Sequence, residues 1–223
     1  TAMRLQNITI ASGAGAFAFG NADSVTDGIT LGSTGVTAHT FTNNSSNPAS
    51  FGSDVRFAFG GGVAKTVTFA GTGNWTFSGK FGNNGTGSVT SVSKTGSGTL
   101  TVNNNIQGTN NGAVLVNPAN IFVKGGTMVI DTNGVVTTSA YSSVGQTGTD
   151  AGTMTLKGTG SFVSGTDFNV GDVGSSTGVL NVQDTAVLTV NTGGGFFVGS
   201  ANGAGSTASG TANHSAGAEA RDA

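Results

Sequence analysis

The chain contains no cysteine, only two prolines and few charges, and each shortage excludes a class of protein. Without cysteine it can form neither disulfide bonds nor thiolate metal sites. Charged residues make up 8% of the chain, and the formal net charge is −2. The eight basic residues are scattered along the sequence, so we expect no concentrated basic face of the kind that binds nucleic acid. No run of 18 apolar residues occurs, so we expect no membrane span.

Glycine, by contrast, is abundant, with 40 copies in 223 residues. This composition would indicate disorder if hydrophobicity were low, but 35% of the residues are apolar and many of them alternate with polar ones. A chain wound into successive stacked coils accounts for both the high glycine content and the alternating apolar residues. Each coil buries a thin apolar stripe, and glycine supplies the positive φ angles that the corners need.

A pattern of five residues recurs at a spacing of 26 residues, as GTMVI at 126–130, GTMTL at 152–156 and GVLNV at 178–182. A period between about 20 and 50 residues indicates one supersecondary unit that stacks on copies of itself. Within each unit the apolar residues lie two apart, which is the period of a β-strand and not of a helix. We therefore predict an all-β, single-stranded parallel β-helix (β-solenoid) with about 26 residues per coil and about eight or nine coils.

The same register predicts which side chains face inward. Fourteen residues fall in these columns: Trp75, Phe77, Leu100, Val102, Met128, Ile130, Met154, Leu156, Phe168, Val170, Leu180, Val182, Phe196 and Val198. We expect a single domain over residues 1–223, with irregular coils over 1–65, regular repeats over 66–205 and the start of a further coil or a tail over 206–223. The motif FAFG occurs at 17–20 and again at 57–60, a spacing of 40 that predicts insertions or a wider coil in the irregular part.

Two further expectations concern side chains at outward positions. Asn169 and Phe197 should point outward, and Phe197 is then the one apolar member of a column whose other members, Ser143 and Asn169, are polar. An exposed aromatic ring on a polar wall is a possible assembly contact. Asp131 and Lys157 share an outward column at a spacing of 26, so they should form an ion pair between adjacent coils, with Gln183 next in line.

Two stretches resemble repeats of bacterial surface proteins. Residues 94–102 (KTGSGTLTV), followed by 125–130 (GGTMVI), resemble the autotransporter-associated β-strand repeat of passenger domains. Residues 152–205 resemble the repeat shared by type V secretion and PEP-CTERM-type surface proteins. The resemblance covers roughly residues 66–205 and implies a right-handed β-helix on an exported bacterial protein, extracellular or at the cell surface. It does not imply one activity, because adhesins, proteases and fibre proteins all carry such repeats.

The residues that could carry chemistry are isolated. Acidic residues such as Asp167 and Asp172 lie in Gly/Ser/Thr turns, where carboxylates are usually solvated. His39 and His214 stand far apart in the sequence with no second type of metal ligand nearby. We therefore predict no catalytic residue, no cofactor and no metal.

The function expected is a non-enzymatic structural or adhesive segment of a surface protein, a stacking unit of an extracellular fibre. Its partners would be other copies, arranged head to tail or laterally, or further coils of a longer parent chain. One alternative is a module that binds a surface glycan, or less readily ice, and another is a carbohydrate-processing enzyme. Aromatic residues clustered on an outward face would favour glycan binding. A long threonine ladder would favour ice, but the outward column changes from Thr76 and Thr101 to Val129, Thr155 and Asn181.

Overall fold

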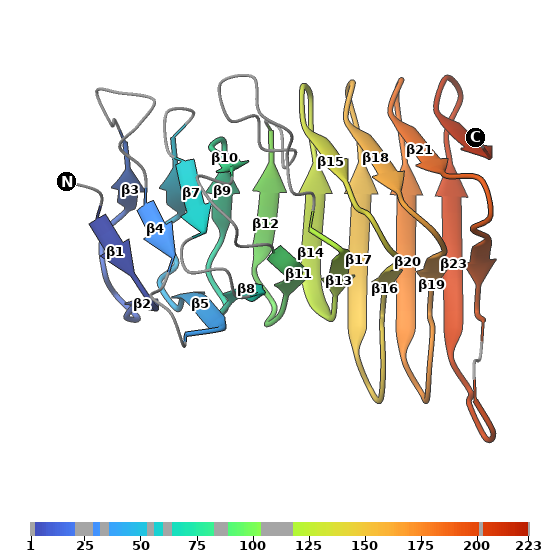
Figure 1. Cartoon of the computed structure of the whole chain (residues 1–223), viewed down its shortest axis with the longest axis horizontal. Helices are drawn as coiled ribbons and strands as arrows, with labels where there is room; N and C mark the ends of the chain where they lie inside the picture. Colours follow the sequence, from blue (N-terminus) through green and yellow to red (C-terminus); the bar gives the residue numbers. More distant parts are fainter. Residues whose placement is uncertain are drawn as a thin grey trace.

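A computed structural model describes residues 3–20, 29–31, 36–52, 56–59, 64–82, 89–103, 118–200 and 203–222. Within these ranges the chain forms 24 strands and no helix, and every strand pair is parallel. These described ranges accordingly offer no helical segment that could cross a bilayer. The strands stack along one axis as a β-solenoid, with the chain termini at opposite ends (Figure 1). The predicted fold class is confirmed.

The strands form four sheets, which we name A to D. Sheet A contains β1 (Met3–Leu5), β4 (Ile29–Leu31), β7 (Arg56–Phe59) and β10 (Lys80–Gly82). Sheet B contains β2 (Ile8–Ile10), β5 (Ala38–Asn43), β8 (Lys65–Ala70), β11 (Val89–Lys94), β13 (Asn120–Val123), β16 (Ser142–Val144), β19 (Phe168–Val170) and β22 (Phe196–Val198). Sheet C contains β3 (Phe17–Phe19), β6 (Ala49–Phe51), β9 (Trp75–Phe77), β12 (Thr99–Val102), β14 (Gly125–Ile130), β17 (Ala151–Leu156), β20 (Thr177–Val182) and β23 (Ser209–His214). Sheet D contains β15 (Val135–Thr137), β18 (Ser161–Ser164), β21 (Val187–Val190) and β24 (Glu219–Asp222).

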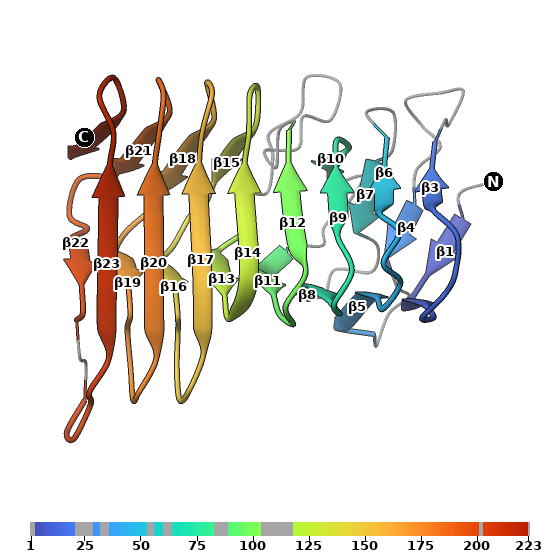
Figure 2. The same cartoon turned by 180° about the vertical axis from the view of Figure 1, so that it is seen from behind.

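Each coil has three sides. The chain passes through sheet B, then sheet C, and then a third side, which is sheet A in the first half and sheet D in the second. Sheets B and C have eight strands each, one per coil, and extend along the whole described solenoid. In Figure 2 sheet C faces the viewer and the strands of sheets A and D lie behind it.

The register between strands explains the sequence period. Met128 pairs with Met154, and Met154 with Leu180, so equivalent residues on adjacent coils are 26 apart. The irregular first part has wider coils, with Ile8 opposite Phe41 in sheet B. The two FAFG motifs lie on different sides, because β3 belongs to sheet C and β7 to sheet A, so their spacing of 40 is not the length of one coil. The strand that pairs with β3 is β6, 32 residues further on, where Phe17 lies opposite Ala49.

The core runs along the axis between the three sides. Twelve of the fourteen residues placed in the inward columns are exposed by 3% or less; Phe196 and Val198 are the exceptions. In the first half the core is aromatic, and the rings of Phe51 and Trp75 stack with centroids 5.4 Å apart. In the second half it consists mainly of methionine and aliphatic residues. Burying one such side chain contributes about 1.5–3 kcal/mol, so the stacked columns hold the coils together.

Glycine is required where the chain leaves sheet B. Gly145, Gly171 and Gly199 each follow the last residue of a sheet B strand and have φ angles of 70°, 71° and 64°. A Cβ atom added at Gly171 would lie 1.9 Å from the carbonyl oxygen of Ser209. The repeated Val-Gly dipeptides of the sequence therefore mark a corner whose positive φ angle and close backbone contact require glycine.

Candidate assembly surface at the C-terminal end

The C-terminal end of the described solenoid exposes apolar side chains of its core. Phe196 and Val198 were predicted to be buried, but they are 39% and 44% exposed. Their direction is inward, because they pair in register with Phe168 and Val170, which are fully buried. The prediction of burial was wrong because β22 is the last described strand of sheet B, so no further strand covers its side chains.

The last strands of sheets C and D carry small or polar residues at the inward positions. Ala212 follows Leu180, His214 follows Val182, Ala220 follows Leu188, and Asp222 follows Val190. The lost side-chain volume leaves a hollow of about 180 Å³ at this end. It is lined by Leu188, Val190, Phe196, Ala220 and Arg221. An apolar group from outside could fill this hollow and bury the surface around it.

Phe197 lies on the outer side of the same strand and is 44% exposed. A Cβ atom added at Gly195 would lie 2.5 Å from the ring of Phe197, so the glycine makes room for this ring. Its register partner Asn169 also has an outward position, but it is only 4% exposed, contrary to the expectation of an open polar wall. Asn169 is flanked in its column by Ser143 and Phe197, and its Oδ1 atom has no hydrogen-bond partner.

The opposite end of the described solenoid is also apolar. Leu5, Ile8, Phe17 and Phe19 pack against the core but remain partly exposed on the first strands of the three sides. The rings of Phe17 and Phe19 lie edge to face with centroids 4.7 Å apart. Both ends therefore combine an unpaired strand edge with exposed apolar side chains.

A second group of aromatic residues lies on the outer side of sheet B. The rings of Phe122 and Tyr141 are 5.3 Å apart, and Lys124 Nζ lies 5.6 Å from the centroid of the Phe122 ring. Gln146 Nε2 donates a hydrogen bond to Tyr141 Oη at 3.1 Å, while Gln146 Oε1 is buried without a partner. Sequence reasoning missed this group. The available signal was Phe122 itself, which replaces the polar residues Ser93 and Ser143 in an outward column.

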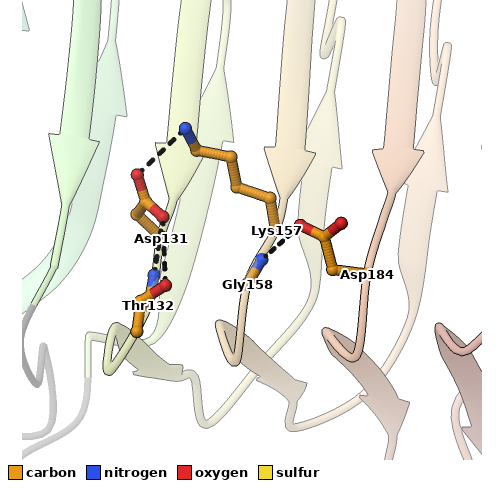
Figure 3. A network of polar contacts seen from close by, with 5 residues as sticks. All are labelled: Asp131, Thr132, Lys157, Gly158 and Asp184. Atoms are coloured by element: carbon orange, nitrogen blue, oxygen red, sulfur yellow. Dashed lines mark hydrogen bonds and ion pairs between the residues drawn. The ribbon is translucent and has the colours of Figure 1, made fainter.

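One predicted polar contact is confirmed on the outer surface. Lys157 Nζ lies 3.0 Å from Asp131 Oδ2, and Figure 3 shows the pair linking two adjacent coils. Partial burial acts to raise the pKa of Asp131, but the hydrogen bond from Thr132 N and the contact with Lys157 outweigh it, so the pKa is lowered. On the next coil, Asp184 Oδ2 accepts a hydrogen bond from Gly158 N at 2.8 Å. These contacts fix the register of the turns.

The core also contains basic groups that the alternation of apolar and polar residues did not predict. Lys94 is 2% exposed, and its Nζ donates to the carbonyl oxygens of Thr95, Gly96 and Gly125 at 2.6, 3.0 and 3.4 Å. Burial lowers the pKa of Lys94 to about 8. His39 is also buried, and its Nδ1 lies 3.0 Å from the carbonyl oxygen of Gln6. Burial lowers the pKa of His39 as well, so the ring is neutral at pH 7.

No three His, Cys, Asp or Glu residues come together as a potential metal site in the part of the chain that the structure describes. Comparison with known proteins returns no matching family model, no matching curated sequence and no matching solved structure.

Proposed function

We propose that the chain is a non-enzymatic structural segment of an exported bacterial surface protein, a stiff rod that is extended through its ends. The ends are covered either by another copy or by further coils of a longer parent chain. The rod is stiff because sheets B and C run along its whole described length as uninterrupted backbone ladders. The repeats at 94–102, 125–130 and 152–205 support an extracellular or cell-surface location through their resemblance to passenger-domain repeats.

The observation that carries this proposal is the apolar cross-section at the C-terminal end. Phe196 and Val198 continue a column whose earlier members are fully buried, and the adjacent hollow is open beside the small side chain of Ala220. Exposed apolar surface next to open strand edges favours pairing with more β-structure.

Sedimentation velocity over a series of concentrations, with electron microscopy of the same samples, tests the proposal. We expect the average mass to rise with concentration and the rods to lengthen without thickening. The variant Phe196→Lys should prevent this growth by placing a charge on the end surface. Thr153→Lys, which places the same charge on the outer face of sheet C, is the matched control and should leave assembly unchanged. A well-folded monomer at every concentration would contradict assembly through copies of this chain.

The aromatic group on sheet B supports a second candidate function, glycan binding. Sugar rings stack on aromatic faces, and Tyr141 is a partly exposed ring whose Oη is held by the hydrogen bond from Gln146 Nε2. A glycan array with the parent chain and Tyr141→Ala tests it. Signals lost in the variant would support this function, whereas identical signals, or none from the parent, would contradict it.

A further inference from the structure

The two ends of the described solenoid are stepped, because the chain passes through the three sides in a fixed order. Because the path is helical, each strand lies about one third of a coil further along the axis than the strand before it. At the N-terminal end the first strand, β1, lies on the third side, followed by β2 in sheet B and β3 in sheet C. At the C-terminal end the last strands are β22 in sheet B, β23 in sheet C and β24 on the third side. The third side therefore carries the outermost strand at both ends.

This arrangement restricts how a second copy can stack. In the same orientation, with β2 over β22 and β3 over β23, β1 of the second copy would occupy the level that β24 already fills. Raising the copy until β1 lies over β24 would leave β2 and β3 a full coil too far from β22 and β23 to form hydrogen bonds. Rotating the copy by one side of the solenoid removes the conflict. Then β1 lies over β22, β2 over β23 and β3 over β24, each at the ordinary strand spacing of about 4.8 Å.

We propose that a second copy of this chain docks on the C-terminal end in this rotated arrangement, about one third of a turn from the first. The inference rests on the proposed end-to-end assembly and specifies its geometry. It extends the interface between coils that already repeats along the chain, in which parallel strands pair and inward side chains stack.

The side chains at the two ends support the same arrangement. Rotation places β3, with the partly exposed rings of Phe17 and Phe19, over β24, where Ala220 leaves the hollow beside Leu188 and Val190 and Asp222 occupies the next inward position. The unrotated arrangement would instead place the two rings over Ala212 and His214 of β23, away from the residues that line the hollow. Rotation therefore brings an aromatic side chain of one end over the empty volume beside Ala220 of the other, whereas the unrotated arrangement places neither ring there.

Disulfide trapping tests the rotation, because the chain has no cysteine of its own. Asn213 on β23 is exposed and points outward, as do Thr9 on β2 and Ala18 on β3. Rotated stacking brings Thr9 of one copy next to Asn213 of another, whereas unrotated stacking brings Ala18 there. The double variants Thr9→Cys/Asn213→Cys and Ala18→Cys/Asn213→Cys share one cysteine and differ only in the other. Mild oxidation at a concentration where the chain assembles should convert the first variant into a reducible ladder of multimers and leave the second largely unlinked.

Each other outcome contradicts a defined part of the proposed assembly. A ladder from the Ala18 variant instead would overturn the rotation and keep end-to-end assembly. If neither variant is linked although sedimentation shows multimers, the contact is not end to end and both proposals fail. If both variants and the parent chain remain monomeric, assembly through copies fails, and the rotation fails with it.

Discussion

Lys157 Nζ lies 3.0 Å from Asp131 Oδ2, one position beyond the paired residues Ile130 and Leu156 of β14 and β17. The contact joins two coils at the point where both strands end and their turns begin. Because the two side chains are 43% and 31% exposed, solvent screens their attraction. The pair therefore favours the correct register of adjacent coils more than it raises overall stability.

A double-mutant cycle with Asp131→Asn and Lys157→Gln measures this pair. We expect a coupling free energy of about 0.2–1 kcal/mol at pH 7 that decreases with added salt. The pKa of Asp131 is lowered in the folded chain, so the stabilisation is present above pH 3.8 and is lost as the pH falls through the lower folded value. Urea unfolding of the parent and the three variants at pH 7 and pH 3 provides the measurement. Coupling of the same size at both pH values would contradict the assignment.

The buried ammonium group of Lys94 predicts a second increase of stability with pH, in the alkaline range. Its pKa is 10.5 in the unfolded chain and about 8 when folded, so between these values the unfolded chain binds more protons. Raising the pH from 8 to 10.5 should therefore stabilise the fold through this group, by at most about 3 kcal/mol. The test compares the pH dependence of unfolding of the parent with that of Lys94→Met, which cannot titrate there. If the free energies of unfolding of the two proteins change in parallel between pH 8 and pH 10.5, Lys94 remains charged in the folded chain over this range.

A charge placed in the inward column of sheet B tests the core. Val170 is fully buried, so Val170→Asp places a carboxylate without a partner between three sheets and should cost about 3 kcal/mol or more. Val198 continues the same column at the exposed end, so Val198→Asp should cost less than about 1 kcal/mol. Thermal melting at low protein concentration, where the ends are free, compares the two. Equal melting temperatures would mean that the column is assigned incorrectly.

The regular part of the fold could be predicted because adjacent coils repeat the same local pattern. Met128, Met154 and Leu180 pair in the register that their spacing indicates, and this register also gave the contact between Asp131 and Lys157. The irregular part could not be predicted in this way. All three sides use the same alternation of apolar and polar residues, so similar motifs such as those at 17–20 and 57–60 can lie on different sides.

The surface at the C-terminal end could be predicted only in part. Alternation gives the direction of a side chain, and it placed Phe197 outward and Phe196 inward. Exposure depends in addition on the next coil, which is a long-range property that local pattern does not contain. The buried position of Lys94 was missed for a related reason, since its three carbonyl partners come together only at a folded corner between two sheets.

Phe197 provides a test of the assembly surface that leaves the core intact. Its ring is 44% exposed on the outer side of β22, so Phe197→Ser should leave the stability of the monomer within about 0.5 kcal/mol of the parent. If the ring contacts a neighbouring copy, its loss should weaken assembly by about 1–2 kcal/mol, or roughly tenfold in the dissociation constant. Val129→Ser is the control, because Val129 is an outward apolar residue in the middle of sheet C, away from both ends. Sedimentation velocity of the three proteins at matched concentrations measures the effect. Equal assembly of the parent and Phe197→Ser would show that the ring is simply an exposed aromatic side chain, while equal weakening by both variants would indicate lateral contacts along the rod.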